Sequence, residues 1–125
     1  MKFVLAILVF IAMSSFVHAH EMTPTYIEIT SSHIDGVATS SVKLFNRRVD
    51  VEYYEISVFD EEWNSIPFAA SNRVIQLNYL ETKNIEVYFR DVDRENITYI
   101  CTTSKLLKSN STSTNISSRI CSKVK

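Results

Sequence analysis

The sequence has almost no glycine and only two cysteines. Its 125 residues include one glycine, two prolines, two cysteines and one tryptophan. Asn, Asp and Ser must therefore carry most of the turns. A positive φ is expected at Gly36, the only glycine, which follows Asp35 in the strongest turn signal of the chain. Two thiols without a third are too few for a structural zinc site.

An excess of charge of one sign is also missing. The chain has 13 Lys and Arg against 14 Asp and Glu, a formal net charge of −1. Because no basic face dominates, the sequence does not favour a nucleic-acid-binding protein. The length suits one domain. A domain of this size buries roughly 60–70% of its unfolded surface, so its core is modest.

Catalytic motifs are missing as well. There is no nucleophile elbow. Asp91, Asp93 and Glu95 alternate as in calcium loops, but the glycine and the distant Glu of an EF-hand are absent. The acidic residues 60–62 read as a charged turn, without the cleft-forming insertions that a glycosidase needs. We therefore expect a protein that is not an enzyme and has no cofactor.

The first 19 residues have the pattern of a signal peptide. Lys2 precedes an apolar run from Phe3 to Met13, and the small residues Val17 and Ala19 occupy positions −3 and −1 of a cleavage site. The run is shorter than the roughly 20 apolar residues of a membrane-spanning helix. We expect export to the periplasm or the medium, with cleavage before His20 and no membrane span afterwards; an uncleaved anchor is the alternative.

The two cysteines, Cys101 and Cys121, read as a disulfide in an exported chain. Closing a loop of about 20 residues stabilises a domain by roughly 3 kcal/mol in the chain-entropy model. A reduced pair is the alternative. The two cysteines lie in consecutive segments that could pair as a hairpin and bring them face to face.

Period-two alternation of apolar and polar residues runs through the chain after the signal peptide, and no segment has helical periodicity. Each segment is short, and they follow one another at spacings near 10 residues. The pattern predicts an all-β, immunoglobulin-like two-sheet β-sandwich of seven to eight strands over residues 20–125. The expected strands are 24–30, 37–46, 51–59, 66–70, 73–78, 83–90, 96–103 and 115–124.

The stretch from Val51 to Phe68 is the expected centre of the fold. Tyr54, Ile56 and Val58 share one face of a strand and should lie in the core. Trp63 follows the acidic turn and is expected to pack beneath it. Aromatic residues on faces opposite the core form either cross-strand pairs or an exposed patch for a partner, and the pairs are favoured. They are Tyr53, Phe59 and Tyr88.

Several segments together carry a family resemblance. They are Thr23-Pro24-Thr25-Tyr26-Ile27-Glu28-Ile29, Val42-Lys43-Leu44-Phe45-Asn46, Tyr54 to Asp60 with Trp63-Asn64, Val74 to Tyr79 with Lys83 to Phe89, and Thr98-Tyr99-Ile100-Cys101. The chain resembles the PapD-type immunoglobulin-like sandwich of the amino-terminal domain of pilus chaperones. It is also similar to uncharacterised single-domain exported proteins of bacteria and their phages, which share a late cysteine pair.

The resemblance implies binding of another protein by completing the partner's sheet at a strand edge, in the assembly of a surface or envelope structure. Pilus chaperones have two such domains and hold a pilin carboxylate with a basic pair, whereas the first expected strand here has no Arg or Lys. Ile116, Ile120 and Val124 offer an alternating apolar row for such an edge. The favoured alternative is that this row faces the domain's own core.

An alternative function is copper binding in the periplasm. His20 would be the first residue after cleavage, and an amino-terminal histidine can bind copper through its amine and its imidazole. It needs a second imidazole, and the only other histidine after the cleavage site is His33. The sequence leaves this as a two-ligand hypothesis.

Overall fold

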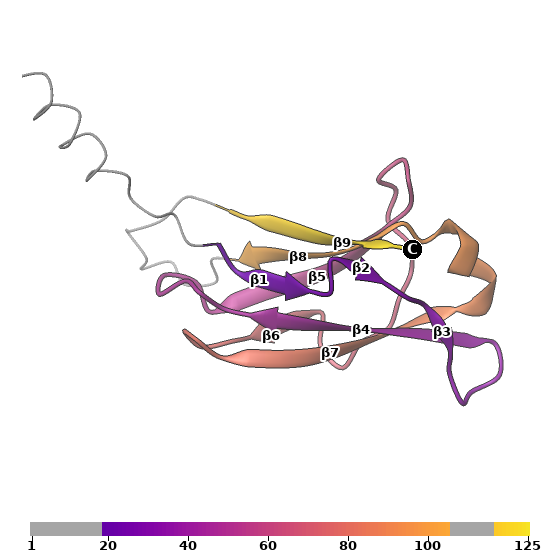
Figure 1. Cartoon of the computed structure of the whole chain (residues 1–125), viewed down its shortest axis with the longest axis horizontal. Coiled ribbons are helices and arrows are strands. Elements are labelled where there is room, and N and C mark those ends of the chain that lie inside the picture. Colours follow the sequence, from indigo (N-terminus) through magenta and orange to yellow (C-terminus); the bar gives the residue numbers. More distant parts are fainter. Residues whose placement is uncertain (1–18, 106–116) are drawn as a thin grey trace, which may run out of the picture.

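The computed structural model describes residues 19–105 and 117–125 of the chain. In these ranges the chain forms nine strands and one 3-10 helix. The strands build two facing β-sheets (Figure 1). This is the expected all-β sandwich. No helix in the two ranges has the length and the apolar character needed to cross a membrane.

The smaller sheet is organised around β4 (Val37–Phe45). Along its whole length β4 pairs antiparallel with β7 (Thr82–Arg90). On its other side it pairs with β1 (Glu21–Thr23) at one end and with β3 (Thr30–Ser31) at the other. One strand therefore holds both ends of the amino-terminal segment.

The larger sheet has the order β2-β9-β8-β5-β6. β2 pairs parallel with β9, and all other neighbours are antiparallel. The helix η1 (Asp91–Asn96) leads from β7 into β8. The strands of this sheet are β2 (Tyr26–Ile27), β5 (Tyr53–Phe59), β6 (Val74–Gln76), β8 (Tyr99–Lys105) and β9 (Arg119–Val124).

The amino-terminal segment differs from the single strand that the sequence predicts for residues 24–30. It leaves the smaller sheet after β1, contributes β2 to the larger sheet and returns as β3 (Figure 1). The peptide bond between Thr23 and Pro24 is cis. At the crossing, the backbone oxygens of Pro24 and Thr25 accept hydrogen bonds from Ser122 Oγ at 2.6 Å and from the Lys123 amide at 2.9 Å. Both sheets therefore share this segment.

The core lies between the sheets and has the side chains that alternation predicts. On β5, Tyr54, Ile56 and Val58 are buried, and β7 buries Ile85, Val87 and Phe89 in the same way. Each fully buried aliphatic or aromatic side chain contributes about 1.5–3 kcal/mol relative to exposure. These two strands therefore supply much of the stabilisation from each sheet.

The structure confirms the expected conformation of Gly36 and contradicts two other local expectations. Gly36 has a φ of +78°, as predicted. The expected strand over residues 66–70 is wrong: the Ile66 amide donates to the Val58 carbonyl of β5 at 2.9 Å, and Ala69 forms an isolated bridge with Tyr88 of β7 through two backbone hydrogen bonds of 2.8 Å. Trp63 does not pack beneath its turn either, because it is 49% exposed on the outer face of the larger sheet.

Asn46 joins the two sheets at one end of the sandwich. Its side chain is fully buried, and Nδ2 donates to the carbonyl oxygens of Val51 at 2.7 Å and Leu77 at 2.9 Å. Oδ1 accepts from the Arg48 amide at 2.9 Å and from the Tyr54 hydroxyl. All four hydrogen bonds of this amide side chain are internal, so it satisfies two loops and one core hydroxyl at once.

We predict that Asn46→Ala destabilises the protein by about 3–5 kcal/mol, because buried carbonyl groups and a buried hydroxyl lose their partners. Urea unfolding of the purified protein measures the loss. Asn64→Ala is the matched control, because the Asn64 side chain is exposed and donates only to Asp60. A loss below about 1 kcal/mol in Asn46→Ala, the typical value for one hydrogen bond, would contradict this role.

Candidate functional site

The first half of β9 has backbone groups that no neighbouring strand of the described chain pairs. Ser118 accepts from the Ser104 amide and Val124 donates to Thr98, so the even-numbered residues of β9 direct their backbone groups to β8. By the alternation of an antiparallel ladder, the amide and carbonyl groups of Arg119 and Cys121 point away from β8. β2 pairs only with residues 123 and 124, so among the described residues these groups have no ladder partner.

The apolar row expected on this strand does not face outward. Ile120 and Val124 are partly buried and pack against the core between the sheets. Ile116, the third member of the row, lies outside the described residues. The groups that β9 leaves without a ladder partner at this edge are therefore the backbone amides and carbonyls of Arg119 and Cys121, rather than these side chains.

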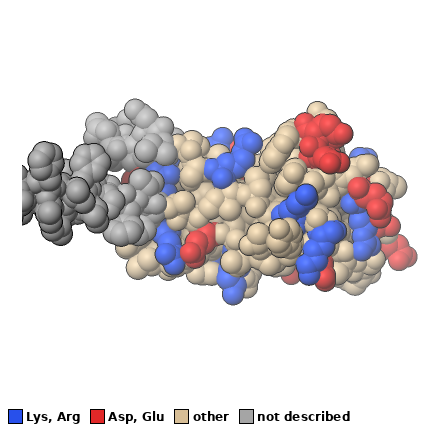
Figure 2. All heavy atoms as spheres, turned by 45° about the horizontal axis from the view of Figure 1, so that its top comes forward, with Lys and Arg blue, Asp and Glu red and all other residues tan. Residues whose placement is uncertain are grey.

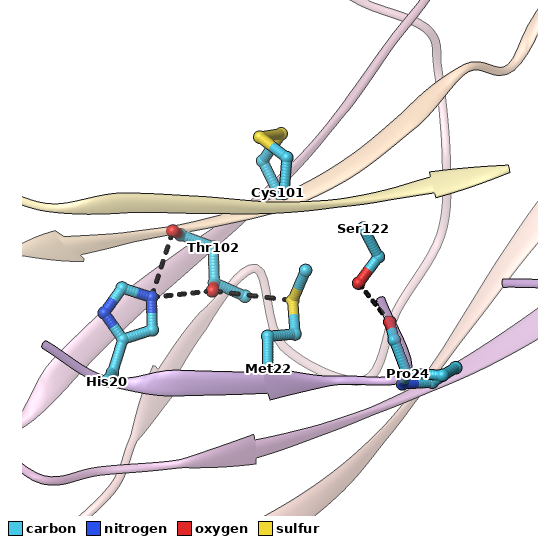
Figure 3. Close-up of a disulfide and its surroundings, with 7 residues drawn as sticks. His20, Met22, Pro24, Cys101, Thr102 and Ser122 are labelled. Carbon is cyan, nitrogen blue, oxygen red and sulfur yellow. Dashed lines mark hydrogen bonds between the residues drawn. A yellow bond between two sulfur atoms is a disulfide. The ribbon is translucent and has the colours of Figure 1, made fainter. Parts of the chain in front are cut away.

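The disulfide lies at the same edge. Cys101 and Cys121 are directly opposite each other in the β8–β9 ladder and are joined by the expected disulfide. Figure 3 shows it on the side of the two strands that faces away from Met22 and the core. The bond ties the open strand to the centre of its sheet.

His20 lies in a buried polar cluster rather than on the surface. It is 1% exposed, and its ring packs 4.6 Å from the Tyr54 ring. Nε2 lies 3.2 Å from the carbonyl oxygen and 2.9 Å from Oγ1 of Thr102 (Figure 3). Because a carbonyl oxygen can only accept, Nε2 carries the proton, and Nδ1 accepts from Ser118 Oγ at 3.2 Å. Both ring nitrogens are thus engaged.

Burial governs the charge of this cluster. Desolvation lowers the pKa of His20 to about 4, and the nearby Arg48 guanidinium acts in the same direction, against the hydrogen bond to Thr102. Burial raises the pKa of Tyr54 to about 12, so its hydroxyl stays protonated and donates to Asn46. Arg48 pairs with Asp50 through two hydrogen bonds of 2.7 and 3.0 Å. The cluster is neutral apart from this ion pair.

The structure does not bring the two proposed copper ligands together. His20 precedes the end of β1 that pairs with Phe45, whereas His33 is exposed in the turn beyond β3, which pairs near Val37. The length of β4 separates them, roughly 25 Å at the rise of a strand. In the described part of the chain, no three His, Cys, Asp or Glu side chains gather in a way that could hold a metal ion.

The other side chains singled out in the sequence have local partners. Asp93 pairs with Arg90 at 2.7 Å, and Asp91 lies 3.9 Å from Arg94 within η1. The Tyr88 hydroxyl donates to Glu86 at 2.7 Å, and Tyr53 is half-buried opposite β6. Asp60 to Glu62 lie in a separate loop, between β5 and β6.

Comparison with solved structures identifies the architecture. The E. coli chaperone DraB superimposes with a TM-score of 0.63 at 15% sequence identity, over 85% of this chain and 53% of DraB. The chain has a PapD-like immunoglobulin-type fold. A PapD-like domain of human CEP192 is also similar, with a TM-score of 0.55 at 12% identity, over 88% of this chain and 92% of that domain. The chain therefore spans about half the length of DraB and nearly all of the human domain.

No protein-family model matches the sequence, and no curated protein matches it either. At identities this low, the structural likeness establishes the fold alone.

Sequence reasoning missed the buried polar cluster and the backbone groups of β9. In the sequence, Asn46 stands out only as the end of a strand pattern, although its buried side chain organises two loops. The direction of the backbone amides and carbonyls of Arg119 and Cys121 depends on the ladder register, and the alternation of side chains does not reveal that register.

We predict that His20 makes the protein less stable as the pH falls from 6.5 to 4. The folded-state pKa lies below the ordinary value of 6.5, so the unfolded state binds more protons in this window and stability is complete only above it. The loss should be on the order of 1–3 kcal/mol. Urea unfolding at several pH values measures it. In His20→Gln, which cannot titrate, the slope should flatten; an unchanged slope would show that other groups cause it.

Proposed function

We propose that this protein is an exported interaction module that binds another protein by adding the partner's extended segment to the open edge of β9. The observation that carries the proposal is the outward direction of the Arg119 and Cys121 backbone groups on a strand fixed by a disulfide. A partner strand would satisfy these groups with ladder hydrogen bonds, which supply affinity without requiring a particular sequence. The role in assembling a surface or envelope structure belongs to the same proposal.

The fold supports this mode of action. DraB is a chaperone, and the similar domain of human CEP192 is PapD-like. The chain matches only about half of DraB, so a function that needs a second domain is not carried over. Because His20 and His33 are far apart and His20 has both ring nitrogens engaged, no observation favours the copper alternative.

Export is part of the proposal and has its own support. A disulfide persists in oxidising compartments, and the first 19 residues have the signal-peptide pattern. We predict that the full chain expressed in E. coli accumulates in the periplasm with His20 as its first residue. Intact-mass measurement of the fractionated protein checks this. Recovery of the chain in the cytoplasm or membrane with residues 1–19 attached would overturn the export proposal.

We predict that Arg119→Pro abolishes binding of extended peptides, because proline removes the outward amide donor of β9 without removing a hydrogen bond to β8. Peptides selected by phage display against the immobilised wild-type protein provide the probe, and their binding is measured by isothermal titration calorimetry. Arg119→Ala keeps the amide and should retain binding within a few-fold. The circular dichroism melting curve of each variant reports whether it is folded.

Val74→Pro is the matched control at the opposite edge of the same sheet. Val74 is opposite Glu55 in a pair that directs its backbone groups away from β5, so proline has the same local consequence there. Peptide binding should survive this change. Loss in Val74→Pro alone would instead place the peptide in the groove of about 470 Å³ between β6 and β7, and would overturn the β9 site. Failure to select any peptide would count against strand addition altogether.

A further inference from the structure

A row of large side chains crosses the outer face of the larger sheet. The ladders place Phe59 of β5 opposite Tyr99 of β8, Tyr99 opposite Lys123 of β9, and Lys123 opposite Tyr26 of β2. Cα partners direct their side chains to the same face, and here this is the face away from the core. Four strands at about 4.8 Å spacing give a row of roughly 15 Å.

Trp63 adds a second layer to this row. Its ring stacks on Tyr99 with centroids 4.3 Å apart and planes inclined by 4°. The loop that carries it projects at the edge of the sandwich (Figure 1) and is closed by a 3.0 Å hydrogen bond from the Asp60 amide to the Asn64 carbonyl. Asp60 Oδ1 also accepts from the Asn64 amide at 2.8 Å. The loop is thus braced in a conformation that keeps a flat aromatic ring about half exposed.

The backbone at Trp63 has a φ of +65°, a conformation that bulky residues rarely adopt. Such a cost persists only where the surrounding structure fixes it, and it is found preferentially at functional sites. Here it places the only tryptophan of the chain over Tyr99 instead of in the core. Tyr26, at the other end of the row, is 60% exposed.

Charges of both signs flank the rings. The Arg119 guanidinium lies 5.5 Å from the Phe59 ring centroid, and Lys123 stands between two tyrosines. Glu61 and Glu62 are exposed in the turn before Trp63. Figure 2 shows acidic side chains clustered at a projecting rim, with basic side chains across the neighbouring surface. Donors and acceptors on either side of flat rings do not select an ion of one sign.

We propose that this aromatic row is a binding platform for a neutral oligosaccharide. The face of an aromatic ring is electron-rich, and the C–H groups on a pyranose face are polarised by the neighbouring oxygens, so a sugar ring stacks on an exposed indole or phenol ring. Its hydroxyl groups both donate and accept, which matches the lysine and arginine beside the rings and the carboxylates of the turn before Trp63. Apart from Lys123, the side chains of the row are aromatic, so its chemistry is that of a stacking surface rather than of an apolar pocket.

The length of the row indicates an oligosaccharide of a few residues. One sugar ring stacks on Trp63, which itself stacks on Tyr99. Lys123 donates to the hydroxyl groups beside that ring, and Tyr26 stacks on a later ring of the oligosaccharide. This site is distinct from the β9 edge, because it uses the outer face of the sheet instead of its backbone.

The test uses the emission of Trp63, the only tryptophan of the protein. Three neutral sugars, cellotriose, triacetylchitotriose and maltotriose, and the corresponding monosaccharides are titrated into the purified wild-type protein, and calorimetry confirms any response. We expect a saturable change in emission with at least one trisaccharide. By calorimetry, Trp63→Ala should bind that sugar about tenfold more weakly or worse. Tyr26→Ala should weaken trisaccharide binding while leaving the monosaccharide response unchanged.

Tyr79→Ala is the matched control, since Tyr79 is a 53% exposed tyrosine outside the row, and it should bind the sugar like the wild type. The proposal is overturned if no sugar changes the emission, or if Trp63→Ala binds as tightly as the wild type. It is also overturned if Trp63→Ala loses only the peptides selected at the β9 edge, which would make the row part of a protein interface. Peptide binding is measured separately, so either proposal can fail without the other.

Discussion

The buried amide of Asn46 is the contact on which one whole end of the sandwich depends. The two loops that meet there bring the carbonyl groups of Val51 and Leu77 into the interior, where both accept hydrogen bonds from Asn46 Nδ2. A side chain with two donors and one good acceptor is the smallest group that can satisfy them and still receive the Tyr54 hydroxyl. The backbone of Asn46 adds two further hydrogen bonds, to Leu80 and Glu81. In a chain with one glycine, the Asn46 side chain stabilises these two loops by hydrogen bonding to their backbone groups.

Polar contacts continue from Asn46 to the strand that carries the proposed function. Asn46 Oδ1 accepts from the Arg48 amide, and Arg48 Nη1 lies 3.4 Å from Ser104 Oγ on β8. Ser104 Oγ accepts from the Ser118 amide at 2.8 Å, and Ser118 Oγ reaches His20. The start of β9 is therefore positioned by the same network that closes the loops. A polar cluster of this kind is costly when incomplete but specific when satisfied, and among the described residues no buried side-chain nitrogen or oxygen lacks a partner.

Alternation of side chains was enough to predict the sandwich and its central residues, because a strand with one buried face leaves a period of two in the sequence. Tyr54, Ile56 and Val58 show this plainly. The crossing of the amino-terminal segment from sheet to sheet was not predictable in the same way, since β2 exists only because β9 lies beside it. The site depends even more on long-range contacts. Alternation identified Ile120 and Val124, but the groups left open are backbone amides whose direction is set by the ladder with β8.

β9 carries both proposed surfaces, and its geometry keeps them separate. Cys121 directs its backbone outward along the sheet, while its side chain is bonded to Cys101 across the sheet. Lys123, two residues later, stands on the outer face in the aromatic row, and its amide is already taken by Thr25. The disulfide thus lies where the part of the β9 edge without a partner strand meets the part that β2 covers. By fixing the pairing of β8 with β9, it fixes at once which amides remain available to a partner strand and which side chains line up between Tyr99 and Tyr26.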